Sequence, residues 1–463
     1  MTKDKINKSR RRLIQSAGTL PIAVSTPIAF GDDHQKNYKK HDAFSLDEIY
    51  PRWKTDSAKW DLQTKRFPGQ KIHAAMGIAD LDFRTAPVIT EAITKRVLHE
   101  NWGYILTPDS YYESIINWIK KRYGEEILRD QLLLATGVLP AIQSAIRAFC
   151  PKNSKVVLNS PGYSELYVNI RKAHCVPDES PLIKKDGRYH LDFDDLSKRL
   201  GKDDVHAFLL VNPHNPTGNC WSKNDLEKVA DVCEQKNVML FSDEIHCDFI
   251  AEDSTFTPVY SLDSEAVKKK AIVFKSTTKS FNLSAFKTGY VYAHDTDVIS
   301  KIREAGHVEF ANTLGVIASE VAYNHAEKWL NQVSSYINEN MILVEEYINK
   351  EIPLIRFNRP QGTYLAWIDF KTWMDAIDAK SNAEKRGENK GDYMERHLVQ
   401  KSGIQLGRGY RFGTGGENYL RMNVGTSRVL LKEALERIKL AAKKNMISSI
   451  FQKLALKELI YES

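Results

Sequence analysis

The chain has 463 residues, 42% of them hydrophobic, which is enough to bury a large core across two or three domains. Its formal charge of +7 is concentrated at one end, because residues 1–31 carry six basic side chains and one acidic one, leaving +2 for the rest. That remainder excludes an extended basic surface for nucleic acid. No run of eighteen apolar residues follows the first thirty, so no membrane span is expected there.

Residues 1–31 resemble a twin-arginine export signal. Ser9–Gln15 reads Ser-Arg-Arg-Arg-Leu-Ile-Gln, with leucine at the usual aromatic position. A moderately apolar run, Leu13–Phe30, follows, and Ala29–Gly31 offers a small-x-small cleavage site. We expect the folded protein to be exported, to the periplasm in a cell with two membranes. A disordered basic tail on a cytoplasmic protein is the alternative.

From residue 131 onward, short apolar runs alternate with helical patterns, which is typical of an α/β fold with a parallel sheet. Ser222 and Asp225 form a capping-box-like start for a helix that runs to about Gln235. The predicted strands are Gln131–Ala135, Lys155–Asn159, His206–Val211, Val238–Ser242, Ala271–Lys275 and Gly289–Ala293.

The remainder of the chain, from about Thr313, is mostly helical in pattern, with a strand-like segment at Thr363–Asp369. Residues 377–392 are crowded with charged residues, asparagine and glycine, and are predicted to be a solvated surface insertion. Five cysteines show no zinc-ligand spacing, so each is predicted to be a buried small hydrophobe. They are Cys150, Cys175, Cys220, Cys233 and Cys247.

Three polar motifs follow predicted strands, where α/β sheets build their sites. Ser276–Lys279 reads Ser-Thr-Thr-Lys, a spacing that is weak evidence alone because penicillin-recognising serine enzymes share it. Asn212–Gly218 reads Asn-Pro-His-Asn-Pro-Thr-Gly, and Ser242–His246 reads Ser-Asp-Glu-Ile-His. The two motifs lie about thirty residues apart, and Ser276–Lys279 follows at a similar interval.

In this order and at these intervals, the motifs closely resemble fold-type I pyridoxal 5′-phosphate (PLP) enzymes of the class I/II aminotransferase superfamily. The resemblance implies an α/β large domain, with a mainly parallel seven-stranded sheet flanked by helices, and a smaller α+β C-terminal domain. The implied division is the leader (1–31), an N-terminal arm that contributes to the small domain (32–75), the PLP-binding domain (76–315) and the small domain (316–463).

The resemblance also assigns roles around the cofactor ring. Lys279 would form a Schiff base with the PLP aldehyde, and burial would lower its pKa enough for proton shuttling. Asp243 would keep the pyridine nitrogen protonated, so that the ring acts as an electron sink. Asn215 would donate a hydrogen bond to the phenolic oxygen, and Tyr163 would stack on the ring.

The cofactor phosphate needs hydrogen-bond donors. Gly137, Val138 and Leu139 lie at a predicted helix start, whose free N–H groups form an anion site. Ser276 and Lys287 are the expected side-chain partners. Lysine departs here from the family pattern, which usually has arginine, and it lacks the bidentate fork.

Two further matches concern the substrate and a second subunit. Arg421, in Leu-Arg-Met-Asn-Val-Gly, matches the arginine that binds the substrate α-carboxylate. Tyr104, in Trp-Gly-Tyr, matches a tyrosine that the family donates to the neighbouring subunit's phosphate. The match implies a homodimer with shared active sites.

Further segments resemble one branch, the bacterial cystathionine and cysteine-S-conjugate β-lyases, from about residue 45 to residue 440. His246 marks this branch, because many aminotransferases have tyrosine there. The implied reaction is α,β-elimination on L-cystathionine or S-substituted cysteines, giving a thiol, pyruvate and ammonia. A PLP aminotransferase is the alternative, and a non-catalytic regulator on the same fold is a third possibility. The matching segments are Ala79–Phe83, Gly103–Tyr104, Ser242–His246, Lys279–Asn282 and Thr363–Trp367.

Overall fold

A computed structural model describes residues 45–461 apart from 307 and 310, with side chains described as far as residue 446. Residues Leu46–Ser463 form one compact unit. The predicted export signal lies outside the described residues, and the domain boundaries at 75/76 and 315/316 stay predictions. No helix in the described part of the chain is long and apolar enough to cross a membrane.

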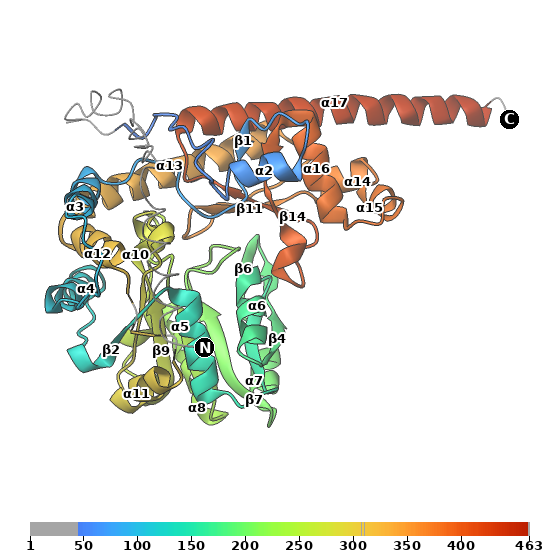
Figure 1. Ribbon diagram of the computed structural model, residues 1–463. Coiled ribbons are helices and arrows are strands. Elements are labelled where there is room, and N and C mark those ends of the chain that lie inside the picture. Colours follow the sequence, from blue (N-terminus) through green and yellow to red (C-terminus); the bar gives the residue numbers. More distant parts are fainter. Residues whose placement is uncertain (1–44, 307, 310, 462–463) are drawn as a thin grey trace, which may run out of the picture. The chain divides into compact units, whose positions relative to one another are not determined.

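A seven-stranded sheet forms the centre of this unit, in the order β2-β10-β9-β8-β7-β3-β4 (Figure 1). Strand β10 is antiparallel to both its neighbours, and the other pairings are parallel. All six predicted strands are confirmed to within one residue at each end. The strands are β2 (Leu132–Ala135), β3 (Lys155–Ser160), β4 (Val176–Pro181), β7 (Val205–Val211), β8 (Met239–Asp243), β9 (Ala271–Lys275) and β10 (Gly289–Tyr292).

Strand β4 was not predicted from the sequence. It reads Val-Pro-Asp-Glu-Ser-Pro, which has two prolines and no apolar alternation. Strand β4 pairs only with β3 and lies at the edge of the sheet. An edge strand tolerates proline because one of its sides needs no ladder hydrogen bonds.

Helices cover the sheet, and both of its faces are buried. Leu133 and Leu209 belong to a core cluster with α5 and α6, while Leu134 and Leu210, on the opposite face, are buried as well. The predicted capping box at Ser222 and Asp225 starts α8. The helices are α3 (Pro87–Val97), α4 (Asp109–Tyr123), α5 (Val138–Phe149), α6 (Ser164–Lys172), α7 (Phe193–Leu200), α8 (Lys223–Gln235), α9 (Glu265–Lys270), α10 (Thr277–Ser280), α11 (Thr296–Glu304) and α12 (Thr313–His325).

The C-terminal part of the chain is mostly helical, as predicted. An antiparallel sheet, β11-β14-β13, lies here, and the predicted segment Thr363–Asp369 contains β11. The N-terminal strand β1 pairs with β12, and β5 and β6 form a hairpin. The elements are α2 (Asp61–Arg66), α13 (Glu327–Glu351), α14 (Lys371–Ala376), α15 (Ala379–Glu384), α16 (Lys390–Ser402), α17 (Arg428–Tyr461), β1 (Ala74–Ala75), β5 (Ile183–Lys185), β6 (Arg188–His190), β11 (Leu365–Asp369), β12 (Ile404–Gln405), β13 (Gly407–Arg408) and β14 (Tyr419–Asn423).

Residues 377–392 carry their charged side chains mostly on the surface, as predicted, but they also form α15 and the start of α16. Ala379 and Ala383 lie one helical turn apart and are both buried. The segment is therefore a packed helical connection as well as a solvated surface. All five cysteines are free and buried, which confirms that prediction.

Candidate active site

The three predicted motifs meet at one edge of the central sheet. Strands β7, β8 and β9 are parallel neighbours, and Asn212–Gly218, Asp243 and Ser276–Lys279 lie at their carboxyl ends. Parallel strands place these ends side by side, which is where α/β sheets bind ligands. The structure thus brings together residues that are about thirty positions apart in sequence.

Lys279 lies in α10, the short helix that follows β9. Its Nζ donates a hydrogen bond of 2.6 Å to the carbonyl oxygen of Ala79, 200 positions away in sequence. Burial lowers the pKa of Lys279 to about 8, and the carboxylate of Asp80 opposes that effect. An amine with this pKa can gain and lose a proton near neutral pH.

Asp243 and Arg421 are two buried ionisable residues without an ion pair among the described residues. Burial raises the pKa of Asp243 to about 7 and lowers that of Arg421 to about 10. Arg421 donates from Nη1 to the side-chain oxygen of Asn215 (3.0 Å) and from Nη2 to the carbonyl of Gly77 (2.9 Å). Its Nε is buried and has no hydrogen-bond partner in the described part of the chain.

His246 is buried beside Tyr364, with the two rings 5.4 Å apart in an edge-to-face arrangement. Burial, and then the nearby charges of Lys279 and Arg421, hold the pKa of His246 well below its usual range. Its Nδ1 is buried, and no residue that the structure describes forms a hydrogen bond with it. The imidazole is therefore neutral, and one nitrogen is available to a ligand.

The predicted phosphate site lies where α5 begins. Gly137 precedes the helix with φ of 155°, and the N–H groups of Val138 and Leu139 have no acceptor within the helix. A side chain at Gly289 would place its Cβ 2.7 Å from the carbonyl carbon of Gly137. Glycine at position 289 therefore lets β10 pack against the start of α5, where the free N–H groups can bind an anion such as a phosphate.

The two side chains predicted to bind the phosphate differ in hydrogen bonding and in exposure. Ser276 donates its hydroxyl hydrogen to the carbonyl of Thr288 (2.6 Å) and accepts from the N–H of Thr278 (3.0 Å). It would have to rotate to donate to a phosphate. Lys287 is exposed, and its charge contributes to lowering the pKa of Lys279, so it lies close to the site.

The two predicted aromatic residues lie in different settings. Tyr163 precedes α6, and burial raises its pKa to about 12, so the phenol is neutral. The charges of Arg421 and Asp243 both act on it, which places Tyr163 at the same site. Tyr104 is fully exposed in the single chain, as is Leu106.

These residues fit PLP on grounds of charge and hydrogen bonding. The site contains a buried carboxylate at Asp243 that lacks a cation, and a protonated pyridine nitrogen would provide one. It contains a buried guanidinium at Arg421 that lacks an anion, and a substrate carboxylate would provide one. The free Nδ1 of His246 and the first turn of α5 provide further hydrogen-bonding groups for PLP.

Several residues of the site were not assigned a role from sequence. Tyr364 donates to the carbonyl of Ala79 (3.1 Å), which Lys279 also contacts. Asn282 and Asn423 both hold the chain beside Ala79 through backbone hydrogen bonds. Tyr364 and Asn282 lie in segments that resemble the β-lyase branch. Asn423 lies two residues after Arg421, in the same motif.

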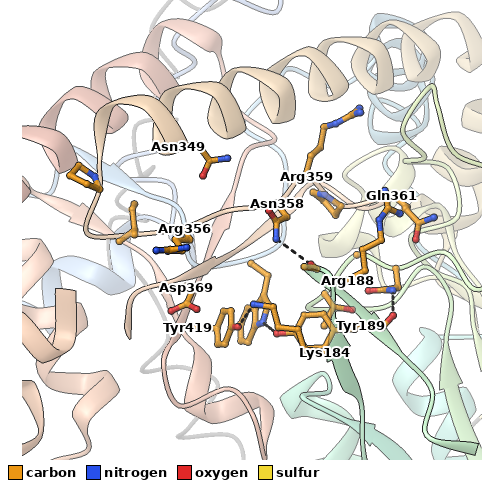
Figure 2. A pocket seen from close by; sticks show the side chains of 18 residues that line it. Lys184, Arg188, Tyr189, Asn349, Arg356, Asn358, Arg359, Gln361, Asp369 and Tyr419 are labelled. Carbon is orange, nitrogen blue, oxygen red and sulfur yellow. Dashed lines mark hydrogen bonds between the residues drawn. The ribbon is translucent and has the colours of Figure 1, made fainter. Parts of the chain in front are cut away.

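A separate cleft of about 630 Å³ borders the end of the Asn212–Gly218 loop (Figure 2). The β5–β6 hairpin forms one wall, and the segment that precedes β11 forms the other. The amide of Asn358 spans the cleft and donates to the carbonyl of Gly187 (3.2 Å). Among the described residues, its lining includes Thr217 and Gly218 but none of the predicted site residues.

Comparison with known proteins finds a family model and relatives that match most of the chain. The sequence model for aminotransferase class I and II matches residues 74–438. The cystathionine beta-lyase PatB of Bacillus subtilis is 30% identical over 400 residues, which cover 86% of this chain and 99% of PatB.

Solved structures agree with that result. A PLP-bound protein of Clostridium difficile 630, described as a candidate aminotransferase, has a TM-score of 0.79 and 33% identity, over 86% of this chain and all of that one. The PLP-bound C-S lyase of Staphylococcus hominis has a TM-score of 0.76 and 26% identity, over 86% of this chain and 98% of that one. Both cover nearly the whole of the described unit.

Proposed function

Since the chain belongs to the class I and II aminotransferase family, we propose that it is a PLP-dependent C–S β-lyase. The substrates would be L-cystathionine or S-substituted cysteines, and the products a thiol, pyruvate and ammonia. The observation that carries the proposal is the buried set of Lys279, Asp243 and Arg421, in which the carboxylate and the guanidinium have no ion-pair partner in the described part of the chain. The similarity to PatB favours elimination over amino-group transfer.

Each residue would perform a separate task. When bound, PLP would supply an electron sink for negative charge at the substrate Cα. Arg421 would hold the substrate α-carboxylate through a bidentate pair. Asp243 would hold a proton on the ring nitrogen, and Asn215 would fix the phenolic oxygen. The first turn of α5, with Lys287, would hold the phosphate.

Lys279 would carry the proton transfers. Its amine, neutral above a pH of about 8, would remove the Cα proton and become an ammonium. The carbon–sulfur bond at Cβ would then break, and the ammonium would return a proton to the departing sulfur. Water would release the remaining three-carbon fragment as pyruvate and ammonia. The neutral His246 adds no charge beside the amine.

We also propose a homodimer in which Tyr104 reaches the neighbouring subunit's phosphate site. The support is the full exposure of Tyr104 and Leu106 and the half-exposure of Trp102. Three large apolar side chains exposed within five residues are costly to leave in water, and a second copy would cover them. Light scattering should give twice the monomer mass, and Tyr104→Phe should weaken cofactor retention.

The experiment that tests the activity measures pyruvate and thiol released from cystathionine and S-alkyl cysteines, with no 2-oxo acid added. Equal and sustained formation of both products would support the lyase. A single stoichiometric conversion of the cofactor to its amine form, reversed by 2-oxo acids, would instead show an aminotransferase. A spectrum that no amino acid changes would show a non-catalytic binder.

A further inference from the structure

A short segment, Gly77–Asp82, crosses the site, and we call it the active-site strap. Its backbone contacts three residues of the site directly. Lys279 and Tyr364 donate to the carbonyl of Ala79, at 2.6 and 3.1 Å, and Arg421 donates to the carbonyl of Gly77 at 2.9 Å. A movement of the strap would therefore move or release all three side chains.

Two asparagines, Asn282 after α10 and Asn423 at the end of β14, fix the backbone of the strap. Asn282 accepts from the N–H of Leu81 and donates to its carbonyl, both at 2.9 Å. Asn423 donates to the carbonyls of Ile78 (2.7 Å) and Asp80 (2.5 Å). Side chains therefore hold a backbone group of every residue from Gly77 to Leu81.

Two cations from the N-terminal arm hold the acidic side chains of the strap. Arg52 donates to the carboxylates of Asp80 and Asp82, at 3.0 Å each, and to the carbonyl of Leu81 at 2.7 Å. Lys59 is completely buried and lies 2.8 Å from Asp82 and 3.6 Å from Asp80. The two cations balance the two carboxylates, which allows all four to be largely removed from water.

The two carboxylates nevertheless differ. Asp82 uses both oxygens within this network, since Oδ2 accepts from Lys59, and Oδ1 accepts from Arg52 and from the indole of Trp60 (2.9 Å). Asp80 uses Oδ2 for Arg52, but its Oδ1 is buried, lies 3.6 Å from the Lys59 nitrogen and has no hydrogen-bond partner among the described residues. The Lys279 amine is bonded to the residue just before Asp80.

The charge of Asp80 acts on Lys279, and that of Asp82 is not among the main influences. After burial, which lowers the pKa of Lys279, Asp80 has the largest effect and raises it. Asp243 also raises this pKa, and Arg421 and Lys287 lower it. The neutral His246 adds no charge to this balance.

We propose that Asp80, held by Arg52 and Lys59, is a positioning residue that stabilises the protonated form of the Lys279 nitrogen. It would thereby make Lys279 a stronger base toward the substrate Cα. This inference deepens the proposed function and rests on it for the catalytic consequence. The effect on the Lys279 nitrogen itself can be measured without turnover.

The test compares Asp80→Asn with Asp82→Asn in the PLP-loaded protein. Both variants remove one carboxylate from the same network, but only the first removes the charge next to Ala79, whose carbonyl Lys279 contacts. The visible absorption of the loaded protein, titrated with pH, reports the proton on the Lys279 nitrogen. We expect Asp80→Asn to move the midpoint down by about one pH unit. Asp82→Asn should leave the midpoint unchanged.

Turnover gives a second readout. Asp80→Asn should lower kcat about tenfold because a weaker base removes the Cα proton more slowly. Asp80→Glu, which keeps the charge, should have the same midpoint as the parent protein. If Asp80→Asn does not fold, Asp80→Ser removes the same charge with a smaller side chain.

Two results would overturn the inference. The midpoint could stay unchanged when the charge of Asp80 is removed, or Asp82→Asn could shift it as far, which would make the network purely structural. Failure of the proposed function is distinguishable. In that case the parent protein releases no pyruvate, while the difference in midpoint between the two variants remains.

Discussion

The guanidinium of Arg421 donates a hydrogen bond of 3.0 Å to the side-chain oxygen of Asn215, a residue 206 positions earlier in the chain. The contact joins β14 to the loop that follows β7, so that two parts of the fold form one anion site. It satisfies one nitrogen of the guanidinium with a neutral oxygen. The positive charge itself stays without an anion among the described residues, and a substrate carboxylate would provide it.

Arg421→Lys should lower kcat/KM about 100-fold. Lysine keeps the charge but loses the planar fork, so one charge-assisted hydrogen bond to the carboxylate disappears, worth about 1.5–3 kcal/mol. Cofactor binding, followed by the visible spectrum, should not change. Arg356→Lys, at an exposed position in the neighbouring cleft, is the matched control. An equal loss of kcat/KM in both variants would contradict the proposal that Arg421 binds the substrate carboxylate.

Asp243→Asn should make the cofactor-free protein more stable above pH 7 and the loaded protein inactive. In the folded chain the pKa of Asp243 is raised from 3.8 to about 7, so the folded state binds the extra proton between these values. Stability therefore falls as the pH rises from about 4 to about 7, and the cost is complete above that. The difference between parent and variant should reach at most about 4 kcal/mol.

The check is urea unfolding of both cofactor-free proteins at pH 5 and pH 8. The free energy of unfolding of the variant, relative to that of the parent, should increase as the pH rises. A difference that is the same at both pH values would contradict the raised pKa. In the loaded proteins the variant should lose the cofactor more readily, because the ring nitrogen has lost its anion.

Lys275→Met should destabilise the protein by about 3–5 kcal/mol. Lys275 is buried at the end of β9, 3.1 Å from Glu244 and 3.5 Å from Glu125, both of which are completely buried. Removal of the one cation leaves two carboxylates without a counter-charge. Lys202→Met, which removes an exposed lysine from Asp178 while Arg199 still pairs with that carboxylate, should cost less than about 1 kcal/mol. Equal midpoints for the two variants in urea would contradict this account.

Much of the large sheet could be predicted from the sequence, because strands buried on both faces have continuous apolar runs. The runs at Ala271–Lys275 and His206–Val211 are of this kind. Edge strand β4 could not be predicted, since it is neither apolar nor alternating. The alanine pair that packs α15 was hidden among charged residues.

Some residues of the site could also be predicted from the sequence, and others could not. Lys279, Asp243 and Asn215 follow strands in motifs, so their meeting at one sheet edge could be predicted. The part played by Arg52 and Lys59 could not, because it depends on where the N-terminal arm passes relative to Asp80 and Asp82. No local pattern in residues 46–60 encodes a contact with a segment some twenty residues later.

Substitution of both Arg10 and Arg11 by lysine should retain the protein in the cytoplasm, if residues 1–31 are the export signal that we propose. The twin-arginine pathway reads this pair, and it would carry the fold with its cofactor already bound. The measurement is the share of protein in the periplasmic or extracellular fraction. Lys3→Arg, which keeps the charge outside the motif, is the control. Unchanged export of the double variant would contradict the proposal.

The most direct test of the central claim is pyruvate formation from cystathionine by the PLP-loaded protein and by Lys279→Ala. The account predicts sustained pyruvate release by the parent, with a loss of at least about 100-fold in the variant, because the group that moves the protons is absent. Lys236→Ala, on the surface at the end of α8, should retain full activity. A Lys279→Ala protein that is folded and releases pyruvate at the parent's rate would contradict the account.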